Sequence, residues 1–388
     1  MSLLFSAILV ATALRGTLDV SNRAQLATRA GGGLAEPTVD ADTSPEVKLT
    51  VRSRRWELTA SYDPRFTGSL AGADRQSYAL QQGRLTTRFQ DRRGSIALYE
   101  DSGYGRLSLL TLGAYAGATP GTTPGTTPIA APPTTAILDY AWSRTGIVAR
   151  LIASRRWSAS LTGELALSGG TSASAQATLP FQTAVRVGIG AEYAASRRDH
   201  LTAVLDTSHA VFSNGVEDTL VQGKVSWRHD LDRTFATTLA AGLGESTTRP
   251  EAAAVARSSA APIVEAGITY RPRGGEIDLG LTVKLSPVID AFSGRIDQRI
   301  EASANVAWTP TRDLAIQAQL GVARSIPWGE GVAMSLGFGG IAASYRVSDV
   351  IQLDAGARSA WIEAPEIDMP AQWMVFTGIT VRIPTLRF

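Results

Sequence analysis

Long segments in which apolar and polar residues strictly alternate are the feature that most constrains this chain. In residues 276–286 (EIDLGLTVKLS), every second residue from Ile277 to Leu285 is apolar, and the residues between them are polar or glycine. A period of two predicts β-strands. The alternating segments are about 11–15 residues long, against about 5–6 for ordinary strands. A tilted strand needs about 9–11 residues to cross a bilayer. Long strands with one polar and one apolar face are typical of a transmembrane barrel with a wet lumen.

The connections between these segments alternate between short and long. Such sorting is expected of a barrel with tight periplasmic turns and larger outer loops, and a soluble sandwich has no reason for it. The short, charged turns lie at 53–55, 90–94, 154–156, 196–199, 229–233, 271–275, 310–313 and 346–349. The longer loops lie at 66–79, 106–134, 168–180, 247–260 and 286–294, with shorter ones at 213–217, 325–331 and 363–371.

The alternation predicts an all-β, antiparallel, up-and-down barrel of about 18 strands. An even number places both termini on the periplasmic side. In the segment 136–153 the apolar set changes face, so we expect a bulge around Ser143–Gly146; if this is a turn, the count becomes 19 or 20, and an uncertain first strand leaves 16 open. The predicted strands are 14–24, 46–53, 55–66, 80–91, 94–106, 136–153, 156–168, 181–196, 199–212, 217–229, 233–246, 261–272, 275–287, 294–308, 313–325, 331–346, 350–363 and 371–384.

Composition excludes several other classes of protein. Hydrophobic residues make up 44% of the 388, which excludes disorder for most of the chain, and no apolar run reaches the length of a helical span. A net charge of +2 gives no reason to expect nucleic-acid binding. With no cysteine and three histidines, disulfides and thiolate metal sites are impossible and most acid–base sites are hard to build.

The two distinctive non-strand segments are the start of the chain and one loop. Residues 4–11 (LFSAILVA) precede Ala11-Thr12-Ala13, which has the form of a signal-peptidase site, so we expect a signal peptide over 1–13 and a single barrel domain over 14–388. An N-terminal strand edge is the alternative. The loop 113–135 is rich in Thr, Pro and Gly, and favours extended, unpaired backbone that either projects as a mobile spacer or folds inward as a constriction.

Aromatic residues mark the predicted membrane boundaries. Tryptophan prefers the headgroup level, so barrels carry two aromatic girdles. The chain ends in Phe388, which resembles the C-terminal signal that outer-membrane assembly machinery reads; Pro384 interrupts the alternation before it and is expected to mark a bulge. The predicted interface residues are Trp56, Trp157, Trp227 and Trp308 near the short turns, and Trp142, Trp328, Trp361 and Trp373 toward the long loops.

The predicted lumen face carries charges of both signs. Confining charge to one face is expected, because a charged side chain facing lipid is costly. Two interpretations remain open: the cations contact an anionic or sugar-like cargo, or the mixed charges pair with one another. The candidates for cargo contact are Arg84, Arg88, Arg150, Arg186, Lys224, Arg228, Arg271, Lys284, Arg299, Arg358, Glu301 and Asp354.

Residues suited to catalysis are scarce. His209 and Ser208 are adjacent in a strand and point to opposite faces, so they cannot pair. Asp297 and Glu301 alternate with Arg299, which is typical of a solvated charge ladder. Gly337-Phe338-Gly339-Gly340 lies in a strand with no helix after it, which excludes a phosphate loop. We therefore expect no enzyme activity, no cofactor and no metal.

Three short motifs carry a resemblance to a known group of proteins. They are the Ser-Arg-Arg-Trp turns at 53–56 and 154–157, Ser-Tyr-Asp-Pro-Arg-Phe at 61–66, and Ser-Gly-Gly at 168–170. Along about 340 residues the chain resembles uncharacterised outer-membrane barrels of myxobacteria and their relatives. More weakly, it resembles their stand-alone 18-strand barrels that carry polysaccharide through the outer membrane. The resemblance implies a partner, a periplasmic export protein that lacks its own membrane-spanning part, and assigns no role to any residue.

These observations predict an outer-membrane conduit that exports a surface polysaccharide. The alternatives are a diffusion porin for small polar solutes and a non-conducting scaffold that anchors a surface machine. The expected surroundings are outer-membrane lipid and lipopolysaccharide, with both termini in the periplasm.

Overall fold

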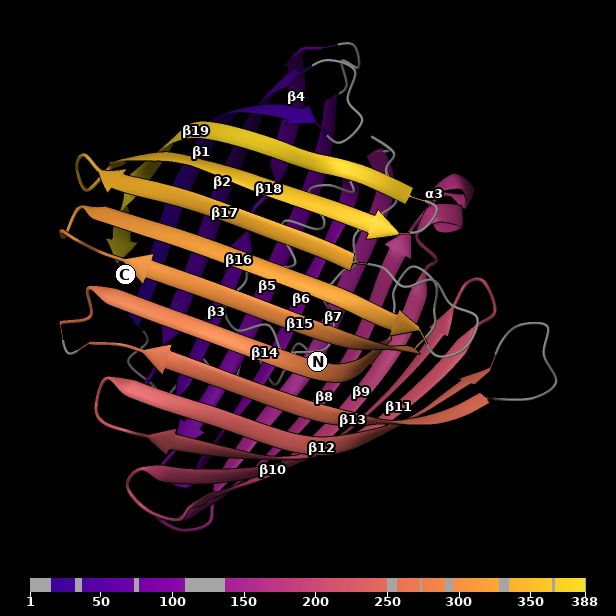
Figure 1. The fold of residues 1–388 in the computed structure, drawn as a ribbon. Helices are drawn as coiled ribbons and strands as arrows, with labels where there is room; N and C mark the ends of the chain where they lie inside the picture. The colour runs from indigo at the N-terminus through magenta and orange to yellow at the C-terminus, as the bar shows by residue number, and fades with distance from the viewer. Residues whose placement is uncertain are drawn as a thin grey trace, which may run out of the picture.

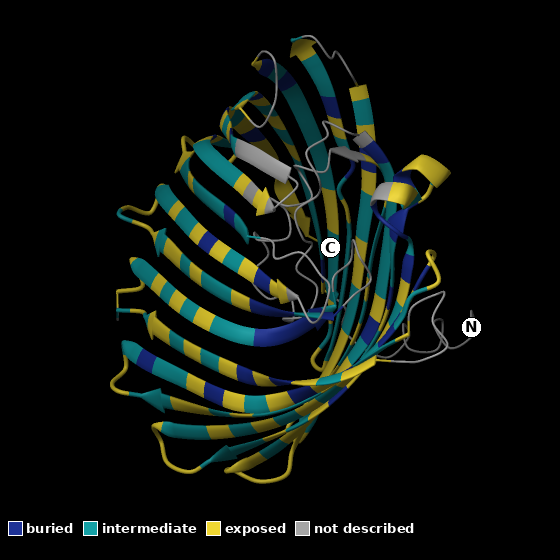
Figure 2. Ribbon diagram, turned by 45° about the vertical axis from the view of Figure 1, so that its right-hand side comes forward, coloured by how far each residue is buried: buried dark blue, intermediate teal, exposed yellow. Residues whose placement is uncertain are grey.

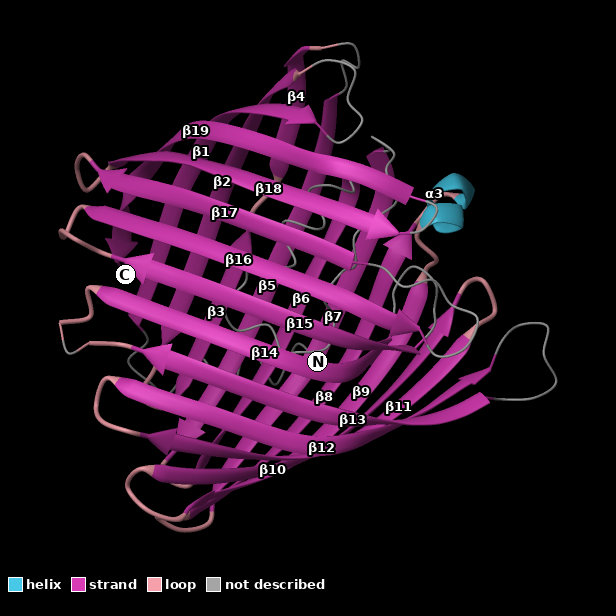
Figure 3. Cartoon of the chain, in the orientation of Figure 1, coloured by secondary structure: helices cyan, strands magenta, loops and turns pink. Residues whose placement is uncertain are grey.

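The computed structural model describes residues 15–31, 37–72, 77–108, 137–249, 257–272, 274–289, 296–327, 335–364 and 367–387. The expected signal peptide over 1–13, the loop 113–135, Trp328 and Phe388 lie outside these residues. Nearly all of the described chain is strand (Figures 1 and 3). No helix of the described part is long and apolar enough to cross a membrane.

The first half of the barrel runs from β1 to β9. A short helix, α3 (Ala173–Thr178), follows β8 beyond the strand ends on the long-loop side (Figure 3). The strands are β1 (Arg15–Gly31), β2 (Thr38–Arg52), β3 (Trp56–Tyr62), β4 (Arg65–Ala71), β5 (Ser77–Asp91), β6 (Gly94–Ser108), β7 (Ile137–Ile152), β8 (Trp157–Gly170) and β9 (Gln182–Ala194).

The second half continues as a regular series of hairpins. Its strands are β10 (Asp199–Phe212), β11 (Glu217–Asp230), β12 (Phe235–Arg249), β13 (Arg257–Tyr270), β14 (Ile277–Ile289), β15 (Ile296–Trp308), β16 (Leu314–Pro327), β17 (Ser335–Arg346), β18 (Ile351–Ala364) and β19 (Ile367–Arg387).

The sheet closes on itself as an eighteen-stranded antiparallel barrel. Each strand pairs with its sequence neighbours, and β19 pairs with β1 from Gly31↔Gln372 to Thr17↔Arg387. Of the nineteen segments, β3 and β4 both lie between β2 and β5, so together they fill one position. The predicted fold class and strand number are confirmed. Closure removes the free edges that an open sheet would expose.

The predicted strand limits were wrong in the first quarter of the chain. The strand expected over 14–24 extends to Gly31, and the one expected over 46–53 begins at Thr38. The strand expected over 55–66 is interrupted after Tyr62 and resumes through Ala71, which shortens the loop expected over 66–79. Small and charged residues there weaken the alternation, and only pairing with neighbours defines the strands.

The expected bulge at Ser143–Gly146 is absent. Strand β7 keeps one register with β6 and with β8 through all of its paired residues. The bulge expected at Pro384 is present, because the β1–β19 register shifts between Leu18↔Leu386 and Val20↔Ile383. The change of apolar face in β7 therefore has another cause: its inner face carries aromatic rings.

Five of the short turns have the same hydrogen-bonding pattern. A side-chain oxygen in the turn accepts hydrogen bonds from the backbone N–H groups two and three residues later, as in Asx and Ser/Thr turns. These bonds replace ladder partners that the turn residues lack. The acceptors are Ser154, Ser196, Asp232, Thr311 and Ser348.

Side-chain exposure alternates along the strands (Figure 2). On β9, Val185, Val187 and Ile189 are exposed on one face, while Arg186 between them is half-buried and ion-paired on the other. The exposed set belongs to the outer face and the paired set to the inner face. The apolar surface of this fold therefore lies outside, the reverse of a soluble domain.

Candidate functional site

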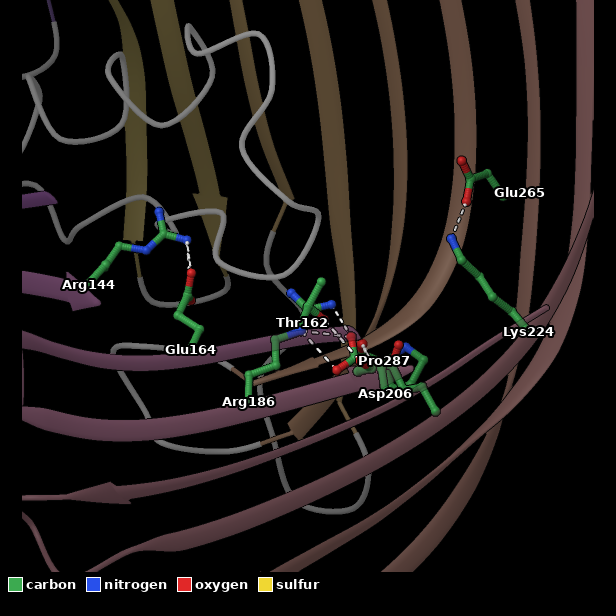
Figure 4. A network of polar contacts seen from close by, with 10 residues as sticks. Arg144, Thr162, Glu164, Arg186, Asp206, Lys224, Glu265 and Pro287 are labelled. Carbon is green, nitrogen blue, oxygen red and sulfur yellow. Dashed lines mark hydrogen bonds and ion pairs between the residues drawn. The ribbon is translucent and has the colours of Figure 1, made fainter. Parts of the chain in front are cut away.

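A ladder of alternating charges crosses the inner wall from Arg144 on β7 to Asp206 on β10 (Figure 4). The hydroxyl of Tyr99 donates to Glu164 at 2.5 Å, and Arg144 Nη2 lies 3.3 Å from the same carboxylate. Arg186 stands opposite Glu164 in the β8–β9 register. The Arg186 Nε donates to both oxygens of Asp206, at 2.9 and 2.7 Å. Each charge thus has an opposite neighbour on the next strand, because inward residues of paired strands face one another.

A second pair spans three strands. Lys224 Nζ on β11 donates to Glu265 Oε2 on β13 at 3.0 Å, across β12. The residue opposite Lys224 on β12 is Gly242, where any Cβ would lie 2.8 Å from Lys224 Cα. The missing side chain leaves a path along the wall for the lysine stem. Figure 4 shows this pair on the concave side of the strands, with the ladder residues.

The end of the β14–β15 hairpin separates from β13 and leans into the lumen, while β15 stays paired with β16 as far as Asp297↔Pro327. Pairing between β13 and β14 stops at Val264↔Leu285, although β14 continues to Ile289 against β15. We call residues 286–289 and 296–299 the inserted hairpin end. The side-chain amide of Gln222 on β11 donates to the Pro287 carbonyl at 3.1 Å, and that of Gln298 donates to the Pro262 carbonyl at 2.8 Å.

The inserted hairpin end is among the most tightly packed parts of the described barrel. Its buried members include Ser286, Pro287, Val288, Ile296, Gln298 and Arg299, the last only 3% exposed. An added Cβ on Gly244 of β12 would lie 2.6 Å from Pro287 Cγ, so this glycine makes room for the proline ring. The hairpin end narrows the lumen where an eighteen-stranded wall alone would leave a wide channel.

Two prolines explain why the wall opens at this place. Continued in the same register, the β13–β14 ladder would set Pro262 opposite Pro287. Proline has no N–H to donate, so neither residue could donate there. The sequence analysis missed this feature; its signal was the presence of a proline in each of two consecutive strands, Pro262 before the short turn at 271–275 and Pro287 after it.

Charged groups surround the base of the inserted hairpin end. Lys284 stands opposite Glu301 in the β14–β15 register, and Arg299 Nη1 donates to Glu301 Oε1 at 3.3 Å. With Lys224 and Glu265 on the neighbouring wall, three cations and two carboxylates gather at this level. Burial of charge in a narrowed, partly dry space strengthens each such interaction relative to water.

Most of the other candidate lumen cations have a partner. Arg84 pairs with Asp101 at 3.0 Å, Arg150 with Glu192 at 2.8 Å and Arg228 with Asp230 at 3.0 Å; Arg271 pairs with Asp278, Arg88 stands opposite Glu57, and Arg358 lies 5.3 Å from the Phe376 ring. The structure thus brings many of the predicted charges into mutual pairs. Their contact with a cargo stays a prediction.

Asp354 lies buried in a network of side-chain hydrogen bonds. Its carboxylate is 6% exposed and accepts hydrogen bonds from Ser344, Gln352 and Thr380 at 2.6, 2.9 and 2.9 Å, with Arg23 Nε at 3.8 Å. These residues lie on β17, β18, β19 and β1. The cluster joins the last strands to the first. Asp354 therefore helps to hold the barrel closed where β19 meets β1.

The predicted interface tryptophans divide into three groups. Trp157, Trp227, Trp308, Trp361 and Trp373 are 37–57% exposed on the outer face; Trp56 shares its face with the exposed Tyr62, and Trp328 lies outside the described residues. The outward assignment is wrong for Trp142. Because β7 has no bulge, Trp142 shares the inner face with Arg144, and its ring lies against Gly103 of β6.

A closed antiparallel barrel of eighteen strands, with an apolar outer face and a polar, narrowed lumen, defines a porin-like β-barrel. A family model described as the EpsX exopolysaccharide export family matches residues 6–386. The chain therefore belongs to the EpsX exopolysaccharide export family.

Two solved structures illustrate what this chain is similar to. OccK9 (OpdG) of Pseudomonas aeruginosa is similar with a TM-score of 0.50 at 9% identity, over 95% of this chain and 98% of that one. OccAB4 of Acinetobacter baumannii has a TM-score of 0.49 at 9% identity, over 95% and 98%. At such identities the likeness concerns the fold alone. A search of curated proteins finds no match to this chain.

Proposed function

We propose that this protein is an outer-membrane conduit through which a surface polysaccharide leaves the cell. The observation that carries the proposal is the match of the exopolysaccharide export family to residues 6–386, nearly the entire barrel. The exposed apolar outer face suits lipid and the lipid part of lipopolysaccharide, and the outward tryptophans would form its two girdles. The chain would insert with its short turns and both termini in the periplasm.

The mechanism we propose is passive. The ladder of Arg144, Glu164, Arg186 and Asp206 offers donors and acceptors that are already paired, so a sugar hydroxyl can exchange with them at little net cost. Conduction requires binding that is weak enough to release. No catalytic step is assigned to the chain. A periplasmic export protein would deliver the polymer to the short-turn side, and assembly machinery would read the C-terminal strand.

One structural feature favours a diffusion porin as the second candidate. The inserted hairpin end narrows the lumen and places Lys284, Arg299 and Glu301 beside the narrowing. A selective pore for small polar solutes needs such a constriction. A polymer conduit tolerates it only if the remaining opening passes an extended sugar chain.

Conductance of the purified barrel in a planar bilayer separates these functions. The export proposal predicts a steady open conductance that is blocked by fragments of the surface polysaccharide of the producing strain. Open conductance without such block would favour the porin. A demonstrably folded barrel that conducts no ions would overturn both, and a non-conducting scaffold would take their place.

A further inference from the structure

An aromatic platform lies on the inner wall between β6 and β8. Trp142 stands opposite Gly103 on β6 and opposite Ser168 on β8. A Cβ on Gly103 would overlap the indole ring, so the ring lies directly on the backbone of the neighbouring strand. The residue is half-buried. One side of the ring is thus covered by the wall and the other is turned to the lumen.

A second aromatic ring extends the platform along β7. The rings of Tyr140 and Trp142 have centroids 5.7 Å apart and planes 30° apart. The Tyr140 hydroxyl is hydrogen-bonded to Ser168, whose Oγ also accepts from Gln182 Nε2 at 2.9 Å. The bond to Ser168 fixes the orientation of the Tyr140 ring. Polar groups of β8 and β9 therefore border a rigid apolar surface.

The other end of the platform carries a guanidinium with an unused donor. Arg144 is the next inward residue of β7 after Trp142, and its Nη2 is held by Glu164 at 3.3–3.4 Å. Its Nε is buried and has no hydrogen-bond partner among the described residues. A buried donor without a partner has lost its hydrogen bonds to water, and no hydrogen bond within the protein replaces them. The Arg144 side chain as a whole keeps 24% of its surface exposed, so its other N–H groups can donate to a hydroxyl oxygen in the lumen.

We propose that Trp142, Tyr140 and Arg144 form a binding site for one pyranose unit of the passing polymer. The inference rests on the proposed export function and names the part of the wall that touches the cargo. A pyranose ring presents C–H groups on one face, which pack on an aromatic ring, and hydroxyls at its edge, which need donors and acceptors. The indole supplies the first and Arg144, with Ser168 and Gln182, the second.

The binding of one sugar unit at this site is weak enough for the polymer to slide. Aromatic contacts contribute roughly 0.5–1.5 kcal/mol beyond burial, so one platform holds a sugar unit briefly and releases it. Trp142 and Trp361 provide a matched pair for a test, because each ring covers a glycine of the neighbouring strand. Trp142 covers Gly103 on the inner face, whereas Trp361 covers Gly337 and is exposed on the outer face.

The test is block of single-channel current by fragments of about six sugar units, prepared from the surface polysaccharide of the producing strain. We expect the blocking constant of Trp142→Ala to weaken roughly two- to twelvefold, the factor that a stacking energy of this size implies. Trp142→Phe should keep most of the block, and Trp361→Ala should keep all of it. Arg144→Gln should also weaken the block, because the guanidinium donors beside the platform are lost. Polyethylene glycol of matched size, which has no stacking face, should block all variants equally.

The outcomes distinguish a failure of this binding site from a failure of the proposed export function. If wild-type barrels conduct but the fragments do not block them, the export function fails and the site fails with it. If the fragments block wild type and Trp142→Ala equally, export stands and the site is overturned. Equal weakening in Trp142→Ala and Trp361→Ala would mean that uncovering a glycine disturbs the wall, and would also overturn the site. Thermal unfolding of each variant confirms that the compared barrels are folded.

Discussion

The side-chain amide of Gln222 on β11 donates a hydrogen bond of 3.1 Å to the carbonyl of Pro287 on β14, across the two strands that separate them in the wall. This contact is possible only because the inserted hairpin end lies inside the barrel. Gln298 Nε2 of the hairpin end donates to the Pro262 carbonyl on β13, so two amide hydrogen bonds hold the hairpin end against β11 and β13. The inward position of the hairpin end both opens the wall between β13 and β14 and narrows the lumen.

A disulfide should hold the inserted hairpin end without changing the channel. In Gly244→Cys/Pro287→Cys the new side chains face each other, and the natural chain has no cysteine to compete. We expect the bond to form on oxidation, seen as a mobility shift on a gel, and the conductance to be equal before and after reduction. A rise in conductance on reduction would show that this end moves during conduction. Gly244→Cys alone is the control.

Restoring N–H donors at the two prolines should close the wall. In Pro262→Ala/Pro287→Ala the β13–β14 ladder can continue, and each hydrogen bond gained contributes about 0.5–1.5 kcal/mol. The hairpin end would return to the wall, so we expect a larger single-channel conductance and a higher unfolding midpoint. Pro45→Ala on β2, where the strand is paired with β1 through this residue, should change neither. An unchanged conductance in the double variant would show that the prolines do not cause the opening.

The Arg186–Asp206 pair should set part of the ion selectivity. Asp206→Asn removes the negative charge that the Arg186 guanidinium binds, and a unit charge roughly 10 Å from the ion path changes ion occupancy about twofold in water. We expect the reversal potential in a KCl gradient to shift toward anions, and Arg186→Gln to shift it toward cations. The double variant should return close to wild type. Shifts of the same sign in both single variants would contradict the assignment of this pair to the lumen.

The turn after β11 should give the barrel a measurable pH dependence. The Thr234 hydroxyl and the backbone N–H groups of Thr234 and Phe235 donate to Asp232 and hold the pKa of its carboxyl below its usual value. A lowered folded-state pKa means that the stabilisation is present above the unfolded value of about 3.9 and is lost as pH falls through the folded value.

The test of this turn compares Asp232→Ala with wild type in urea unfolding. We expect the variant to have the lower midpoint at pH 7, and the difference to shrink at pH 3. Asp232→Asn keeps an acceptor for the backbone but carries no charge, so its midpoint should fall between the two at pH 7. A difference between wild type and Asp232→Ala that grows toward pH 3 would reverse the sign and refute the role of the carboxylate.

Most of the fold could be predicted because strand alternation is a local property. Each inward or outward position from β8 to β19 follows from a period of two within one segment, and so do the charged positions such as Arg186 and Lys284. Alternation does not reveal a strand where neighbouring residues differ little in hydrophobicity. In β2 the run from Thr38 to Ser44 alternates small and acidic residues, and pairing with β1 and β4 makes it a strand.

Trp142 was misplaced by the assumption that tryptophans near strand ends face the lipid. The sequence analysis places Trp142 on the outer face and expects a bulge at Ser143–Gly146, because the apolar set changes face along this strand. The structure keeps β7 regular and turns the ring inward, because Gly103 on the neighbouring strand leaves room for it. That room depends on which residues stand opposite each other, which is a property of the register between strands.

The amino-acid sequence by itself determined the period of the strands, their number, the sorting of short and long connections and the face on which charge lies, because each depends on neighbours within one segment or on composition. Only the tertiary structure decided the partners of each charge, the inward turn of Trp142 and the inserted hairpin end. Those depend on contacts between strands, such as Lys224 with Glu265 across Gly242, and on a ladder that ends where Pro262 and Pro287 would meet. Closure of the wall brings these residues together.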